Sequence, residues 1–200
     1  MMRLMLISCI IVCCMDWGKL VAQPALPDLC NTNDSVGLYN ITMEFSKNTL
    51  SGLLILKKTN DSTLRLVLNA EMGPKLLEME LSPNGYKTIY VFKKLNKKRV
   101  LRTFYEDFGA LSGILVWNKT SILDTSQFTQ SFTYNLGNQK KIIYITEPAN
   151  LRINSGKVMD GKHVNTIFYY FYDPSIFGVS SMKLDHQHFR MVILLKKISL

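Results

Sequence analysis

The stretch NKKRVLRTFYEDFGALSG, residues 96–113, decides the fold because it alone carries the pattern of a long helix. Its apolar residues recur at steps of three and four positions and so form one broad stripe on a helix. The stripe consists of Val100, Leu101, Phe104, Tyr105, Phe108 and Leu111. The charged residues fall on the other faces: Lys98, Arg99, Arg102, Glu106 and Asp107. An apolar stripe needs a surface to cover, so the rest of the chain must supply one.

The charges at the two ends of this helix are opposite to those that a helix dipole favours. Lys97, Lys98 and Arg99 fall in the first turn, and Glu106 and Asp107 come late. Each unfavourable charge costs roughly 1 kcal/mol or less, whereas burial of the stripe contributes on the order of 10 kcal/mol as an upper bound. We therefore expect the helix to be stabilised by packing against its neighbours.

The remainder of the chain reads as β-strands. Leu64, Leu66 and Leu68 alternate with more polar residues, and Leu77 and Met79 repeat this pattern in the following segment. The turn signal at 82–85, Ser-Pro-Asn-Gly, joins that segment to the next strand. Counting such segments predicts a mainly β, α+β fold of about ten or eleven strands. We expect one curved antiparallel sheet with the main helix packed on its concave face.

The second half of the chain is rich in aromatic residues. Phe128 and Phe132 share one face of a strand with Tyr134 and Leu136. The run 168–172, Phe-Tyr-Tyr-Phe-Tyr, places rings on both faces of another strand. Core packing explains such a run, and so does a ligand-facing wall in which Tyr169 or Phe171 touches an apolar guest.

The first residues resemble a secretory signal. Arg3 precedes the apolar run 4–15, which is too short to span a bilayer as a helix. We divide the chain into a signal segment (1–22), an extended tether (23–37) and one domain (38–200). We expect lipidation at Cys14; Cys9 and Cys13 are alternatives, as is signal cleavage near Ala22.

The formal net charge of +9 narrows the choice of partners. Most lysines stand in pairs at strand ends, where they are usually solvated. Attraction to anionic lipid headgroups stays open. Nucleic acid is not predicted as a partner, because neither an arginine-rich helix nor a ribonucleoprotein-type aromatic motif accompanies the charge.

No pattern in the sequence predicts catalysis, a metal or another cofactor. His186 and His188 would face the same way on a continuous strand, but no third ligand is identifiable. Nucleophile elbows and phosphate-binding glycine loops are missing. Cys30 is the only thiol beyond the signal segment, so no disulfide is predicted. Arg65, at the centre of a strand, is expected to be solvated.

Four segments carry a resemblance to a known family: 50–58 (LSGLLILKK), 71–73 (EMG), 78–81 with 85–86 (EMEL and GY) and 94–98 (KLNKK). In these segments the chain resembles the periplasmic lipoprotein-localisation factors, carrier and outer-membrane receptor. It is more similar still to uncharacterised bacterial envelope lipoproteins of the same architecture. The likeness covers most of residues 38–198. It implies an unclosed β-barrel whose concave face, with helices as a lid, holds acyl chains.

We therefore expect an exported, non-enzymatic lipoprotein of a Gram-negative bacterium, anchored in the outer membrane and facing the periplasm. It would bind an acyl chain, or the lipid moiety of a lipoprotein, between sheet and helix. The alternative is a structural or protein-interaction lipoprotein with a filled core. The volume beneath Phe104 and Phe108 discriminates between the two. The candidate cavity and lid residues are Val100, Leu101, Phe104, Phe108, Leu111, Leu66, Leu77, Met79, Phe132, Tyr169 and Phe171.

Overall fold

A computed structural model describes residues 24–30, 35–71, 73–147, 152–173 and 178–198. Within these ranges the chain has twelve strands, one α-helix and two 3-10 turns. The strands are β1 (Val36–Phe45), β2 (Asn48–Asn60), β3 (Thr63–Ala70), β4 (Lys75–Ser82), β5 (Gly85–Val91), β6 (Ser121–Thr125), β7 (Gln130–Gly137), β8 (Lys140–Thr146), β9 (Ile153–Asp160), β10 (His163–Tyr172), β11 (Val179–His186) and β12 (Met191–Lys197). The helical elements are η1 (Lys93–Leu95), α1 (Lys98–Leu111) and η2 (Ile114–Val116). The predicted mainly β fold is confirmed.

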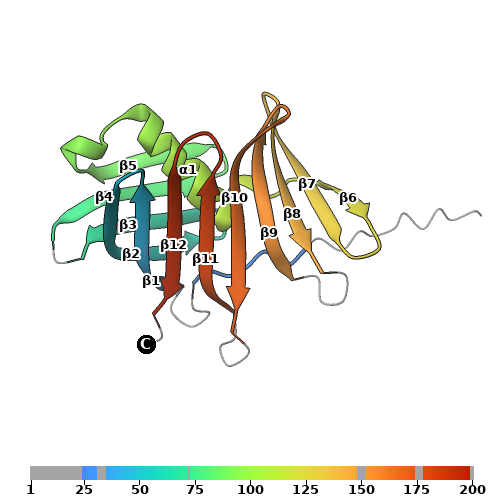
Figure 1. Cartoon of the computed structure of the whole chain (residues 1–200), viewed down its shortest axis with the longest axis horizontal. Helices are drawn as coiled ribbons and strands as arrows, with labels where there is room; N and C mark the ends of the chain where they lie inside the picture. Colours follow the sequence, from blue (N-terminus) through green and yellow to red (C-terminus); the bar gives the residue numbers. More distant parts are fainter. Residues whose placement is uncertain (1–23, 31–34, 72, 148–151, 174–177, 199–200) are drawn as a thin grey trace, which may run out of the picture.

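All twelve strands belong to one antiparallel sheet in the order β5-β4-β3-β2-β1-β12-β11-β10-β9-β8-β7-β6. The pairing of β1 with β12 joins the first five strands to the last seven. The sheet ends at β5 and β6 and does not close, and α1 is the chain segment that runs between these two edges. Figure 1 shows α1 lying against the curved sheet.

The alternation read from the sequence places the core correctly. Leu64, Leu66 and Leu68 of β3 are buried, as are Leu77 and Met79 of β4. Their face of the sheet receives the buried apolar side chains of α1: Leu101, Phe104, Phe108, Ala110 and Leu111. The helix and the inner face of the sheet thus share one apolar core.

Two expectations about the elements were inexact. The helix begins at Lys98 rather than residue 96, because Lys97 is extended and forms the N-cap position. The strand β6 was not predicted, and with it the described residues contain twelve strands rather than ten or eleven. Its pattern is weak because it is short and mostly exposed, with Ile122 pointing to solvent.

The segment 24–30 packs against the sheet, which differs from the extended tether expected over 23–37. Leu29 and Cys30 are buried. The hydroxyl of Tyr39 donates a hydrogen bond to the carbonyl of Leu29 over 2.6 Å. A Cβ on Gly37 would stand 2.0 Å from that carbonyl oxygen, so the close approach requires glycine. The strand β1 then begins at Val36, inside the expected tether.

The outer face of the sheet carries a covered ion pair that was not predicted. Glu78 is buried, although its alternation with Met79 places it outward. Arg65 Nε donates to Glu78 Oε1 over 2.8 Å, and Lys75 contacts the other carboxylate oxygen. Hydrogen bonds from Lys75 and Arg65 lower the pKa of Glu78. Arg65 lies on the outer face with 38% of its side chain exposed, as expected, and it is also an ion-pair partner of Glu78.

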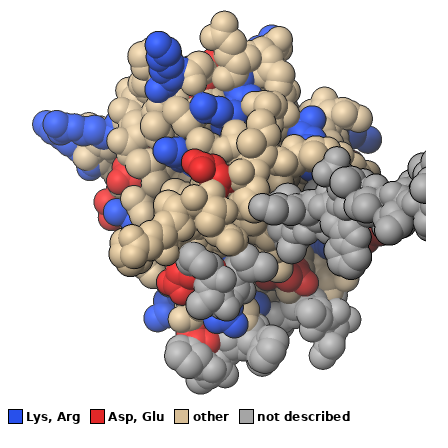
Figure 2. Space-filling model, turned by 90° about the vertical axis from the view of Figure 1, so that its right-hand side faces the viewer, with Lys and Arg blue, Asp and Glu red and all other residues tan. Residues whose placement is uncertain are grey.

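The signal segment and the candidate lipidation site, Cys14, lie outside the described residues. Among the described residues, no helix has the length and hydrophobicity that a membrane span requires. Figure 2 shows Lys and Arg side chains projecting at several separate places on the side of the molecule that it displays. On that face the basic residues are dispersed rather than gathered in one patch.

We predict that Phe108→Ala lowers the free energy of unfolding by about 3–5 kcal/mol, because the ring is fully buried between helix and sheet. The matched control is Phe128→Ala, since that ring is 77% exposed, and its cost should stay within about 0.5 kcal/mol. Urea unfolding of both variants tests this. Equal losses in the two variants would show that α1 does not pack as described.

Candidate functional site

The C-terminal end of α1 is fixed to the sheet by two tyrosines. The hydroxyl of Tyr144 in β8 donates to the carbonyl of Ala110 over 2.6 Å. The hydroxyl of Tyr170 in β10 donates to the carbonyl of Leu111 over 2.8 Å. Burial raises the pKa of both hydroxyls, so both remain donors. These carbonyls have no partner within the helix, and that of Ala110 also accepts from the backbone N–H of Gly113 just beyond it.

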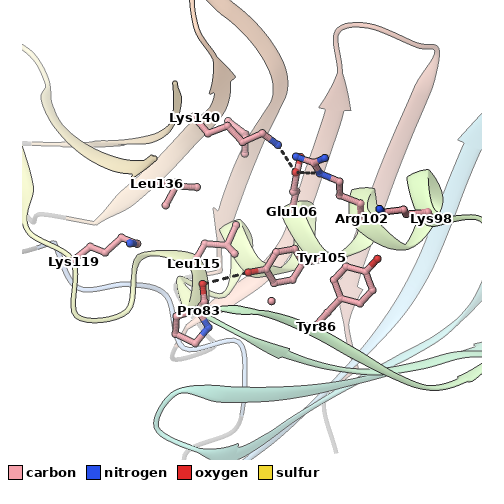
Figure 3. A pocket seen from close by; sticks show the side chains of 12 residues that line it. Pro83, Tyr86, Lys98, Arg102, Tyr105, Glu106, Leu115, Lys119, Leu136 and Lys140 are labelled. Carbon is pink, nitrogen blue, oxygen red and sulfur yellow. Dashed lines mark hydrogen bonds and ion pairs between the residues drawn. The ribbon is translucent and has the colours of Figure 1, made fainter. Parts of the chain in front are cut away.

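Three consecutive residues of α1 contact three different parts of the sheet, because successive side chains point about 100° apart around a helix. Tyr105 donates from its hydroxyl to the carbonyl of Ser82, over 3.0 Å, at the β4–β5 hairpin. Glu106 contacts Lys140 of β8 and accepts a hydrogen bond from Arg102 Nε over 2.8 Å. Figure 3 shows the contacts of Glu106. The third residue, Asp107, points to β10 and β11.

Asp107 forms a buried polar contact between α1 and the sheet. Its Oδ2 lies 2.9 Å from Nε2 of His186 in β11, and Thr166 of β10 donates to its Oδ1 over 3.3 Å. The other ring nitrogen of His186, Nδ1, lies 3.2 Å from the carbonyl oxygen of Met191. Because a carbonyl only accepts, we assign a proton to Nδ1. Nε2 and Oδ2 can form a hydrogen bond only if one of these two atoms also carries a proton.

The surroundings of this pair favour keeping that proton. Asp107 is 2% exposed. Burial raises the pKa of its carboxyl, and this outweighs the opposite effect of the hydrogen bond from His186. The sequence placed Asp107 on an outward polar face, and this interpretation was wrong. His186 and His188 were expected to face the same way only on a continuous strand, and the strand ends at His186. His186 ends β11 and is buried, whereas His188 lies exposed in the following turn.

An apolar cavity of about 390 Å³ lies beside the N-terminal half of α1. Its walls come from α1, η1, the adjoining ends of β1 and β2, and the β11–β12 connection. It is lined by Met43, Phe45, Leu50, Leu95, Arg99, Val100, Thr103, Phe104, Asp107, Phe189 and Met191. Arg99, Thr103 and Asp107 are its polar residues. Few polar groups in a mainly apolar wall are typical of sites for small apolar ligands.

Only some of the cavity and lid residues that were predicted from the sequence line this cavity. Val100 and Phe104 do. The others on the inner side belong to the filled core beneath the helix: Leu101, Phe108, Leu111, Leu66, Leu77, Met79 and Phe132. The prediction that Tyr169 and Phe171 face the cavity was wrong. The pleat of β10 turns these two side chains outward, while Phe168 and Tyr170 face the core. Phe171 is 51% exposed.

The cavity residues that were missed lie at strand ends and in connections. Phe45 ends β1, Leu50 lies near the start of β2, and Phe189 stands in the turn before β12. Apolar residues beside turns were the available signal, but no local pattern shows that these three turns meet. Among the described residues, no cluster of three or more His, Cys, Asp or Glu side chains could hold a metal ion.

The arrangement of the elements matches solved structures. A LolA superfamily protein from Nitrosomonas europaea superimposes with a TM-score of 0.55 at 8% identity, over 86% of this chain and 87% of that one. A putative outer membrane lipoprotein-sorting protein domain from Vibrio parahaemolyticus gives a TM-score of 0.48 at 11% identity, covering 82% and 84%. A DUF1329 family protein from Desulfovibrio piger gives a TM-score of 0.48 at 8% identity, over 84% of this chain and 85% of that one. No protein-family model and no curated protein matches the sequence. The first comparison shows that the chain shares the fold of that protein.

We predict that Asp107→Asn makes unfolding less dependent on pH. A raised pKa in the folded state means that folding favours the protonated carboxyl. The stability linked to this proton is complete below about pH 3.9, the ordinary carboxyl value, and is lost as pH rises through the folded-state pKa. Asparagine imitates the protonated carboxyl at every pH.

The stability of Asp107→Asn relative to the native protein should therefore rise by about 1–2 kcal/mol between about pH 5 and pH 9. Urea unfolding at both pH values measures it. Asp124→Asn is the matched control, because Asp124 is exposed on β6 and should show no such trend. A stability difference that is the same at both pH values would contradict the assignment of the shared proton.

Proposed function

We propose that this chain, which has the fold of a LolA superfamily protein, binds an acyl chain in the apolar cavity beside the N-terminal half of α1. The observation that carries the proposal is the cavity itself, about 390 Å³ between helix and sheet. Volumes of this size are typical of small-ligand sites. The lipid moiety of a lipoprotein would present the same chemistry.

The lining suits a flexible hydrocarbon chain. Met43 and Met191 have unbranched, polarisable side chains that adapt to a guest, and Phe45 and Phe104 add aromatic surface. Each buried methylene group contributes about 0.8 kcal/mol, so a medium-length chain suffices for measurable binding. No carboxyl group is required in the ligand, but Arg99 offers a partner for an anionic head. Arg99 forms no ion pair with another described residue.

Entry of the ligand would involve the N-terminal half of α1. No side chain caps that end, and its first turn carries Lys98 and Arg99 against the helix dipole. The C-terminal half is bound by the hydroxyls of Tyr144 and Tyr170. We infer that the N-terminal half moves away from the sheet while the C-terminal half stays in place, which would open the cavity.

The cellular setting belongs to the same proposal. We infer a non-enzymatic protein that is exported by the signal-like segment 1–22, lipidated at Cys14 and held at the outer membrane, facing the periplasm. The basic and apolar pattern of residues 3–15 supports export. The LolA superfamily fold supports a role in handling lipids or lipoproteins in the envelope.

The second candidate is a protein-interaction lipoprotein without a ligand. Phe108 is fully buried, and the core beneath the C-terminal half of α1 is filled. This filled part favours a structural role for the helix. The cavity beside Phe104 favours the first candidate, and a binding measurement decides between them.

We predict that the purified domain takes up a fluorescent fatty acid and that Val100→Trp abolishes this uptake, because the indole would occupy the cavity. Ile89→Trp is the matched control: it also replaces an aliphatic residue by tryptophan, but at an exposed position on β5. Circular dichroism would verify that both variants fold.

The expected result is a loss of affinity of about tenfold or more for Val100→Trp and no change for Ile89→Trp. Extraction of the native protein for mass spectrometry should also release a co-purified lipid. If neither uptake nor co-purified lipid were observed, the interaction protein would be the better description.

A further inference from the structure

A second pocket, of about 460 Å³, lies on the other side of α1 from the apolar cavity. Helical spacing separates the two, because residues 98, 102, 105 and 106 share one side of the helix and 99, 100, 103 and 107 share the other. We call it the basic pocket. It is lined by Pro83, Gly85, Tyr86, Lys98, Arg102, Tyr105, Glu106, Leu115, Lys119, Leu136, Lys140 and Val158.

One wall of the basic pocket is apolar. The rings of Tyr86 and Tyr105 pack with their centroids 5.4 Å apart, and Leu115 and Leu136 continue this surface. The hydroxyl of Tyr105 already donates to the β4–β5 hairpin, so the ring is fixed in place. Figure 3 shows the rings of Tyr86 and Tyr105 below the helix and the side chains of Arg102, Glu106 and Lys140 above it. The wall can receive a carbon skeleton.

The rest of the lining carries four cations and one carboxylate: Lys98, Arg102, Lys119, Lys140 and Glu106. Glu106 contacts both Arg102 and Lys140. Asp160 is close enough to Arg102 to act with Glu106 in raising the pKa of the guanidinium. Lys98 and Lys119 form no ion pair with any described residue. The pocket therefore has an excess of positive charge.

Glu106 also explains how like charges stay together. Its carboxylate holds the Arg102 and Lys140 side chains on the same side of the pocket, and Lys140 is only 17% exposed. Cations fixed in this way lose less freedom when a ligand binds. Several fixed donors suit an anion with several oxygen acceptors.

We propose that the basic pocket binds a phosphate ester, with the phosphate among Lys98, Arg102, Lys119 and Lys140 and its carbon skeleton against Tyr86, Tyr105 and Leu115. Phosphate has the oxygen acceptors that these donors require, and the tyrosine wall gives the ester an advantage over inorganic phosphate. The ester could be part of an anionic lipid headgroup or a soluble molecule. This site is separate from the apolar cavity and does not depend on the function proposed above.

A structural role for the same ion pairs makes a different prediction. If the network only attached α1 to β8, then Glu106, Arg102 and Lys140 would matter and the unpaired Lys98 and Lys119 would not. The test therefore uses K98A/K119A, which leaves the network intact. The matched control is K93A/K94A, because those lysines are exposed on η1 outside the pocket and their removal changes the net charge equally.

The experiment is an NMR titration of ¹⁵N-labelled protein with three probes: glycerol 3-phosphate, dihexanoyl phosphatidylglycerol as monomers, and glycerol. We expect amide shifts around Lys98, Leu115 and Lys119 with the phosphate-bearing probes and none with glycerol. K98A/K119A should weaken binding by about tenfold or more, and K93A/K94A by less than about twofold.

Each outcome decides the proposal. Similar binding of both phosphate probes supports a soluble ester, and binding of the lipid alone supports a headgroup. No shift with either probe, equal shifts with glycerol, or equal weakening in the two double variants would overturn the site. Val100→Trp should block the fatty acid but not the phosphate probes, so failure of the acyl-chain proposal is distinguishable from failure of this one.

Discussion

The hydrogen bonds from Tyr144 and Tyr170 to the last carbonyls of α1 are the contacts on which the rest of the structure depends. The sheet does not close, so its inner face needs a cover. Among the described residues, α1 is the α-helix in the segment that connects the two edges, and Lys98 and Arg99 in its first turn oppose its dipole. Two buried hydroxyls and the ring of Phe108 supply what the helix lacks. The C-terminal half of α1 is thus fixed to the sheet by hydrogen bonds and by apolar packing.

The two sites follow from this asymmetry. Where the helix is fixed, its side chains are buried in the apolar core. Where only apolar side chains hold the helix, near Val100 and Phe104, a cavity remains. On the opposite side, Glu106 brings Arg102 and Lys140 together and leaves other cations of the basic pocket without partners. One helix therefore separates an apolar site from a cationic one.

Local patterns in the sequence predicted the fold but only part of the site. Alternation in β3 and β4 and the stripe on α1 are properties of neighbouring residues, so the core could be read directly. Asp107 lies next to Glu106 in a polar run, and its partner His186 is 79 positions away. No local rule distinguishes a carboxylate that meets such a partner from a solvated one. Three residues that line the cavity were missed for the same reason, since Phe45, Leu50 and Phe189 meet only in the folded chain.

We infer that the two halves of α1 differ in stability and that the N-terminal half opens the cavity. Hydrogen exchange of the amides of α1, with and without a fatty acid, tests it most directly. We predict that residues 102–105 exchange faster than residues 108–111 in the free protein, and that the ligand slows exchange only in the first group. Uniform exchange along the helix, unchanged by the ligand, would contradict the account.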